Sequence, residues 1–158
     1  MRARVTMDHP SPSESGIMPY KLTRYEDLTV GQRASFTKTV TDADLSHFIA
    51  ITGDTNPLHV DEPFASQTFF GGRIAHGMLS ASLFSTLVGL HLPGIGAIYR
   101  SQTLEFLRAV HIGDTLTAWF EITGVDPAAE RIDIASWIEN QRGERVVEGQ
   151  TVASLLRG

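Results

Sequence analysis

The segment "HGMLSASLFSTLVGLHL" at residues 76–92 constrains the fold most, because its apolar and small residues lie all round a helix. Such a helix must be covered on most sides, either by the rest of the chain or by a partner subunit. After residue 95 come four strand-like segments, "IGAIYRSQTLEFL", "DTLTAWFEITGV", "RIDIASWIENQ" and "ERVVEGQTVASLL", with turns at "DPAAE" and "QRGE". Successive strands favour an antiparallel sheet over β-α-β units. The sequence therefore predicts an α+β fold in which an antiparallel β-sheet wraps around one long central α-helix.

The segments before this helix contain shorter elements. Residues 33–40 alternate as a strand does, and Thr41 with Asp44 resembles a capping box that begins a helix ending near Gly53. Pro57 disfavours a helical conformation at the preceding residue, so we expect "GDTNPLH" to begin a loop and "DEPFASQT" to add a helical turn. In the later strands we expect the side chains of Ile132, Ile134 and Trp137 to face the core.

The length of 158 residues suits one domain, which we place at residues 21–158 after a flexible leader at residues 1–20. The leader "MRARVTMDHPSPSESGIMPY" has no continuous apolar core of the kind that a secretory signal needs. The longest apolar stretch is interrupted by serines, a proline and glycines, which argues against a membrane span. These features predict a cytoplasmic protein.

Charge and composition exclude several classes of function. A formal net charge of -5 argues against a nucleic acid or an anionic membrane as partner. The absence of cysteine excludes disulfides, thiolate metal sites and a cysteine nucleophile. An anionic ligand would need local cations or backbone N–H groups.

The stretch "TGDTNPLHVD" at residues 52–61 is either a polar turn or a site. It places Asp54, Asn56 and His59 close together, and its two titratable groups can converge on one water. A metal held by His59, Asp61 and His76 is a minor alternative, and we expect no metal. The remaining histidines, His47, His91 and His111, have no ligand spacing and are expected on the surface or in packing.

The residues "FIAITGDTNPLHVDEPFASQT" and "GGRIAHGML" resemble the signature of the MaoC-like, (R)-specific enoyl-CoA hydratases, or hydratase 2 family. The similarity covers roughly residues 30–155. The matching positions are an apolar and a small residue, then G-D-x-N-P-apolar-H and, after five intervening residues, Ala or Ser: Ile51, Thr52, Gly53, Asp54, Asn56, Pro57, Leu58, His59 and Ala65. One departure is Ala109 in "FLRAVHIGD", where the family often has proline. The resemblance implies the hot-dog fold.

It also implies an activity: addition of water across the double bond of a trans-2-enoyl-CoA, giving an (R)-3-hydroxyacyl-CoA. The family's catalytic pair corresponds to Asp54 and His59. We expect Asp54 to act as the base toward water, with His59 sharing the proton movement, and Asn56 to hold the loop or the water. No cofactor is expected, since coenzyme A is part of the substrate.

The start of the long helix is the expected oxyanion site. A helix N-terminus presents unpaired N–H groups, and glycine lets a ligand approach closely, so the N–H of Gly77 is the candidate. We expect His76 to order this turn. One helical face is expected to line the acyl pocket, and on it Ser85 either contacts water or substrate or bonds back to its own helix. That face comprises Gly77, Ala81, Phe84, Ser85 and Val88.

Several points stay open. Arg73, Arg100 and Arg108 are all candidates to bind the phosphates of coenzyme A. A hot-dog acyl-CoA thioesterase and a non-catalytic hot-dog subunit are the alternative functions. The G-D-x-N-P-x-H loop argues against the first, and the presence of both Asp54 and His59 argues against the second. Because the helix is too apolar for one side of a small sheet, we expect a homodimer or a higher homo-oligomer.

Overall fold

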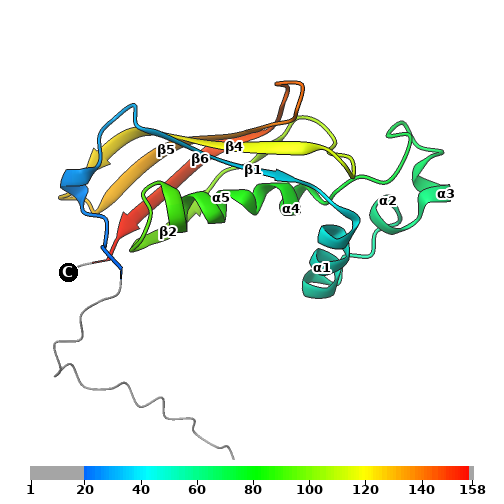
Figure 1. Ribbon diagram of the computed structural model, residues 1–158, viewed down its shortest axis with the longest axis horizontal. Coiled ribbons are helices and arrows are strands. Elements are labelled where there is room, and N and C mark those ends of the chain that lie inside the picture. The colour runs from blue at the N-terminus through cyan, green and yellow to red at the C-terminus, as the bar shows by residue number, and fades with distance from the viewer. Residues whose placement is uncertain (1–19, 157–158) are drawn as a thin grey trace, which may run out of the picture.

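The computed structural model describes residues 20–156, so the expected leader lies, apart from Tyr20, outside the described residues. Within this range a curled antiparallel sheet arches over a central helix (Figure 1). The strand order is β1-β4-β5-β6-β2, with the short β3 also paired to β6. The strands are β1 (Arg33–Thr39), β2 (Ala97–Gln102), β3 (Glu105–Phe106), β4 (Thr115–Asp126), β5 (Arg131–Glu139) and β6 (Arg145–Leu155).

Alternation along the strands separates the two faces of the sheet. In β4, Leu116, Ala118, Phe120 and Ile122 are fully buried beneath the sheet, as a period of two requires. Ile132 and Ile134 of β5 are buried as expected. The expectation for Trp137 was wrong. It lies an odd number of residues from Ile132, so it points to the outer face and stacks there with Trp119.

The central helix is formed by α4 (Gly77–Ala81), α5 (Leu83–Thr86) and the π-helical turn η2 (Leu87–His91), with a break at Ser82. Its sheet-facing side chains are buried, and Phe84 stacks on Phe120 with ring centroids 5.5 Å apart. Away from the sheet, Met78 is 56% exposed and Leu90 is 64% exposed. The sheet of one chain therefore covers only one side of a helix that is apolar on several sides.

Three short helices, α1 (Asp42–Thr52), α2 (Pro57–Val60) and α3 (Glu62–Ala65), form a lobe beyond one end of the sheet (Figure 1). The capping box forms as predicted: Asp44 N–H donates to Thr41 Oγ1, and Thr41 N–H donates to the Asp44 carboxylate. Gly53 ends α1 with a φ of 74°, in the left-handed region that favours glycine.

The expected loop after Gly53 is shorter than predicted. The Oδ1 of Asn56 accepts from the N–H of Leu58 and caps α2, with Pro57 as its first residue. His59 is therefore carried by a helical turn and only Asp54 by a loop. Proline restricts the residue before it, but it is well suited to the first helical position itself.

The chain after residue 95 forms five strands, because the first expected strand divides into β2 and β3 around Thr103. At this division the carbonyl of Thr103 crosses Gly149 so closely that a Cβ built on Gly149 would lie 1.8 Å from the Thr103 oxygen. A single-turn 3-10 helix, η1 (Tyr25–Asp27), precedes the sheet. Among residues 20–156 no helix has the length and hydropathy needed to span a membrane.

Candidate active site

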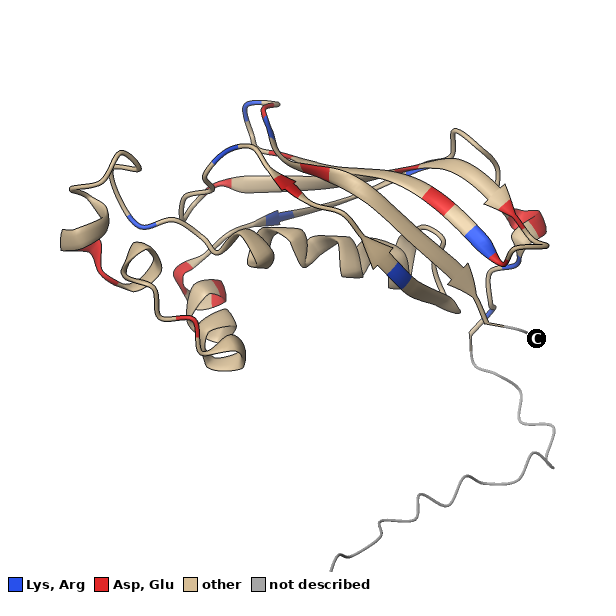
Figure 2. Ribbon diagram, turned by 180° about the vertical axis from the view of Figure 1, so that it is seen from behind, with Lys and Arg blue, Asp and Glu red and all other residues tan. Residues whose placement is uncertain are grey.

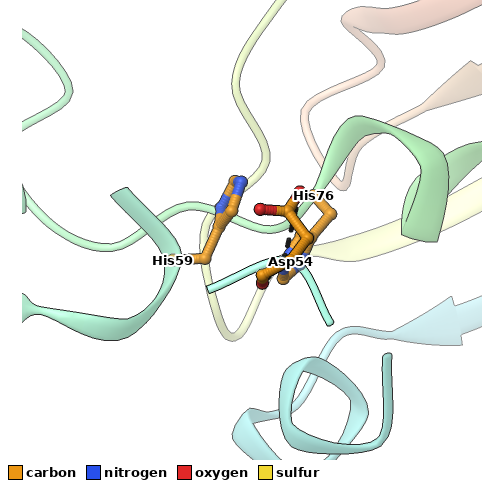
Figure 3. Close-up of side chains that lie close together, drawn as sticks. All are labelled: Asp54, His59 and His76. Carbon is orange, nitrogen blue, oxygen red and sulfur yellow. Dashed lines mark hydrogen bonds and ion pairs between the residues drawn. The ribbon is translucent and has the colours of Figure 1, made fainter. Parts of the chain in front are cut away.

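Asp54, His59 and His76 meet at the end of the sheet beside the three-helix lobe (Figure 3). Asp54 follows α1, His59 lies in α2 and His76 immediately precedes α4. One nitrogen or carboxylate oxygen of each lies within 4.8 Å of those of the other two. Both histidines are buried, whereas the Asp54 side chain is 51% exposed. The Asp54 carboxylate can therefore contact water, whereas the two imidazoles beside it are shielded from bulk solvent.

The tautomer of His59 follows from its hydrogen bond. Its Nδ1 lies 2.8 Å from the carbonyl oxygen of Ile74, which can only accept, so Nδ1 carries the hydrogen and donates. In the neutral ring, Nε2 then keeps a lone pair. Since His59 also lines the adjacent pocket, this nitrogen is suited to accepting or returning a proton at a ligand.

The Asp54 carboxylate is held by its own loop. Its Oδ1 accepts from the N–H of Asn56 at 3.2 Å, and its other oxygen lies 4.0 Å from Nε2 of His76. The structure thus places the backbone of Asn56 against Asp54, while the Asn56 side-chain oxygen caps α2. No lysine or arginine of residues 20–156 forms an ion pair with Asp54.

A pocket of about 810 Å³ opens beside His59 at the start of the central helix. Gly77 and Ser80 contribute its helical wall, and most of the remaining lining is apolar. Such a lining suits an aliphatic chain. The other lining residues are Phe69, Phe70, Ile74, Ala75, Met78, Phe106, Leu107, Arg108, Ala109, Val110, His111 and Val147.

The helical face that lines this pocket differs from the predicted one. Gly77 lines it, and as the first residue of α4 its N–H has no acceptor within the helix. Ser85 is exposed and lies outside the lining, while Ala81, Phe84 and Val88 are buried in the protein core. Ser80 is the pocket serine instead. A helix with apolar residues on several sides does not indicate which side meets the sheet.

The three candidate arginines differ in their surroundings. Acidic residues are frequent on the α1–α3 lobe (Figure 2), and Arg73 is paired there with Asp42 at 2.7 Å and Glu62 at 3.5 Å. Arg100 donates to Ser154 Oγ on the neighbouring strand. Arg108 alone of the three lines the pocket, and its guanidinium has no hydrogen bond or ion pair with another described residue, although its charge reaches Glu144.

Sequence reasoning missed the aromatic side of the pocket. Phe69 is 91% exposed, its ring centroid lies 3.9 Å from that of Phe70, and His111 Nε2 donates to the carbonyl of Phe70. Phe106 closes the pocket beside Gly77. Two consecutive phenylalanines before "GGRIA" were the only signal, and an apolar pair without periodicity does not distinguish a pocket wall from core.

The metal-ligand set considered from the sequence is not the one that the fold assembles. The Asp61 carboxylate accepts from the N–H of Phe64 and caps α3, and Asp54 takes its place in the cluster. The two imidazoles are stacked, with centroids 3.7 Å apart, and His76 Nε2 is engaged by the main chain of Asp54. A metal bound at that nitrogen would displace this hydrogen bond.

An antiparallel sheet curled over a central helix defines a hot-dog-fold protein, and here an imidazole in the wall of an apolar pocket lies close to a carboxylate. The chain belongs to the MaoC-like family: the model of the MaoC like domain matches residues 27–141. The resemblance noted in the sequence is thereby confirmed.

Individual relatives share most of their length with this chain. It is 44% identical over 135 residues to an (R)-specific enoyl-CoA hydratase of Rhodospirillum rubrum, covering 85% of this chain and 93% of that protein. Two solved structures are similar, both described as R-hydratases. That of PhaJ1 from Pseudomonas aeruginosa has a TM-score of 0.81 and 40% identity, with 87% and 88% of the two chains covered. That of the Aeromonas caviae enzyme involved in PHA biosynthesis has a TM-score of 0.80 and 41% identity, with 83% and 99% covered.

Proposed function

We propose that the protein is an (R)-specific enoyl-CoA hydratase, a hydro-lyase that adds water to a trans-2-enoyl-CoA and gives an (R)-3-hydroxyacyl-CoA. One observation carries the proposal: His59 lines a largely apolar pocket, and the Asp54 carboxylate lies within 4.8 Å of its ring nitrogens. The relatives named as (R)-specific enoyl-CoA hydratases support it, with 42–44% identity over most of the chain.

In this proposal the two groups act on one water. The exposed Asp54 carboxylate takes the proton of the water as oxygen attacks C3 of the enoyl group. His59, with Nδ1 anchored on Ile74, uses Nε2 to share the proton transfer that ends at C2. The negative charge that develops on the thioester oxygen is stabilised by the N–H of Gly77, which lies in the same pocket wall. These groups suffice for hydration, and we propose no metal or further cofactor.

The coenzyme A portion of the substrate must extend out of the pocket, so its phosphates lie near the pocket rim. Of the candidate cations, we assign the phosphate contact to Arg108, because Arg73 is already neutralised by two carboxylates and Arg100 does not line the pocket. An arginine without an ion-pair partner can bind phosphate without giving up an existing contact.

We also propose that the working form is a homodimer in the cytoplasm. The edge strand β2 has an unpaired side and exposes Ile98 and Tyr99, and the central helix exposes Met78 and Leu90. A second copy would cover both kinds of surface.

The decisive experiment uses purified protein and crotonyl-CoA. Loss of the enoyl absorbance without release of free thiol, followed by oxidation of the product by an (R)-specific 3-hydroxyacyl-CoA dehydrogenase, is the expected result. Release of thiol would indicate a thioesterase instead. Neither signal, from folded protein over a series of acyl chain lengths, would indicate a non-catalytic subunit. The Asp54→Asn variant is the control for contaminating activity.

A further inference from the structure

The side chain of His76 contacts both proposed catalytic residues. Its Nε2 lies 3.0 Å from the main-chain oxygen of Asp54, and its ring is stacked on that of His59 at a centroid distance of 3.7 Å and an angle of 30°. Phe48 of α1 packs on it as well, at 4.9 Å. The side chain is 2% exposed, so these contacts define its surroundings.

The hydrogen bond fixes the tautomer of this ring. A carbonyl oxygen only accepts, so Nε2 of His76 carries the hydrogen and donates to Asp54. Its Nδ1 is buried and has no hydrogen-bond partner among residues 20–156. The ring is therefore held by one hydrogen bond and by its aromatic contacts. A ring flip would put a carbon in the place of Nε2 and remove this donor to the main-chain oxygen of Asp54.

The segments that carry the catalytic pair need such a connection. Asp54 lies in the loop after α1 and is half exposed, and His59 lies in a helix of four residues, α2. No hydrogen bond within residues 20–156 joins Asp54 to His59 directly. The main chain of Asn56 links them locally, since it donates to Asp54 Oδ1 and accepts from the N–H of His59. His76 links both of them to the start of the central helix.

We propose that His76 is a positioning residue of the hydratase: its Nε2–H holds the main chain of Asp54, and its ring face holds the imidazole of His59. This inference rests on the proposed function. It assigns His76 no proton transfer. A displacement of about 1 Å in a catalytic group can lower a rate about 10²-fold, so the loss of either contact should lower kcat.

Two substitutions separate the two contacts. His76→Gln keeps an amide donor near the position of Nε2 and removes the ring, whereas His76→Phe keeps a ring between His59 and Phe48 and removes the donor. We expect each to lower kcat with crotonyl-CoA by about 10–10²-fold and to change KM by less than about threefold. His47→Gln and His47→Phe are the matched controls, on an exposed histidine of α1, and should retain the wild-type kcat.

The outcomes are distinct. Wild-type kcat in both folded His76 variants would overturn the proposal, and so would a rise in KM alone, which would place His76 in substrate binding. A loss as large as that of Asp54→Asn in both variants would make His76 a catalytic group and also overturn it. If the wild-type protein does not hydrate crotonyl-CoA, the proposed function is wrong, and this result is distinct from any result with the His76 variants.

Wild-type protein gives a second test that does not depend on the folding of a variant. In ¹⁵N-histidine-labelled protein, NMR should show hydrogen on Nε2 of His76 and on Nδ1 of His59, with contacts between the two rings. The opposite tautomer of His76 would remove the donor to Asp54 and overturn the proposal. Phe48→Leu, which removes the ring that packs on the face of His76, should give a smaller reduction in kcat. An unchanged kcat in this variant would contradict the proposal that the ring of His76 holds the imidazole of His59.

Discussion

The ring of Phe106 lies directly against Gly77. A Cβ built on Gly77 would be 2.8 Å from Cε1 of Phe106 and 3.0 Å from its Cδ1, closer than side chains normally approach. Phe106 belongs to the two-residue strand β3 and is half exposed, so its ring can swing aside without disturbing the core. A side chain at position 77 would therefore displace the wall of the pocket and also approach the ligand that we place there.

The contact between Gly77 and Phe106 predicts that substitutions at the two positions have coupled effects on kcat/KM. Gly77→Ala should fold, because the ring of Phe106 can move, but the displaced ring should narrow the pocket and lower kcat/KM for crotonyl-CoA by about tenfold. Phe106→Leu alone should have a smaller effect, and the double variant should recover most of the loss. A coupling energy of about 1 kcal/mol in this double-mutant cycle is typical of residues in contact. Additive losses would show that the contact does not govern access.

Removal of either proposed catalytic group should abolish hydration without unfolding the protein. Asp54→Asn cannot accept the proton of water, and His59→Gln has no Nε2 lone pair. Each should lower kcat by about 10²–10⁴-fold, as is typical when a positioned acid or base is lost. Circular dichroism confirms folding, and rates come from the enoyl absorbance. A variant that kept most of its kcat would remove that residue from the mechanism.

Arg108→Gln should weaken the binding of coenzyme A esters specifically. We expect KM for crotonyl-CoA to rise about fivefold, corresponding to roughly 1 kcal/mol for an exposed ion pair, with little change in kcat. The matching pantetheine thioester lacks the nucleotide phosphates and should be insensitive to the substitution. Arg100→Gln serves as the control, and equal effects on both substrates would assign Arg108 to another role.

The capping box of α1 should make part of the stability depend on pH. Burial alone would raise the pKa of Asp44, but hydrogen bonds from Thr41 and Lys38 outweigh it and hold this pKa below its ordinary value. A group with a lowered pKa in the folded state stabilises the fold above its unfolded-state pKa, and this contribution is lost as pH falls through the folded-state pKa.

Asp44→Asn should therefore lower the free energy of unfolding by about 1 kcal/mol at pH 7. The difference from wild type should shrink in acid, once Asp44 is protonated in both states. Urea unfolding at several pH values measures this. Asp42→Asn, in the same first helical turn, removes a carboxylate that takes no part in the capping box and is the control. A pH-independent difference would contradict the assignment.

The exposed β2 edge and helix face predict self-association. Light scattering at micromolar concentration should give at least twice the chain mass of 17.3 kDa. Tyr99→Lys, which places a charge on the free edge strand, should shift the mass toward that of one chain. A monomeric wild type would contradict both the prediction and our assignment of this edge.

Periodicity and capping residues were sufficient to predict most of the fold. The capping box at Thr41 and Asp44, the glycine at position 53 and the alternation in β4 each express a local rule, and each is found in the structure. Trp137 was misplaced because the apolar character of a residue was given more weight than its parity in the strand. The lobe helix that carries His59 was missed because a proline that ends one helix can also begin another.

The candidate site could be predicted only in part from the sequence, because several of its residues lie far apart along the chain. Asp54 and His59 are near neighbours in sequence, so one motif identified both, but the contacts of His76 reach them across 22 and 17 residues. Phe106 and Arg108 lie farther still along the chain. Which side of the central helix faces the pocket depends on how the helix is rotated against the sheet, and a helix with apolar residues on several sides carries no signal for that rotation. Ser80 therefore lines the pocket described here, and the expected contact of Ser85 with substrate stays a prediction.

The crossing of Thr103 over Gly149 has a consequence for the pairing register of the sheet. Thr103 also exchanges hydrogen bonds with the next residue, Gln150, at 2.9 Å through both its main chain and its hydroxyl. A slip of β6 by one residue would bring Glu148 or Gln150 beneath the Thr103 carbonyl, where no side chain fits. Only one alignment of β6 with β3 is thus permitted, and in it Val147 stands opposite Phe106. Both residues line the pocket, so this single glycine fixes where the pocket wall lies relative to the sheet.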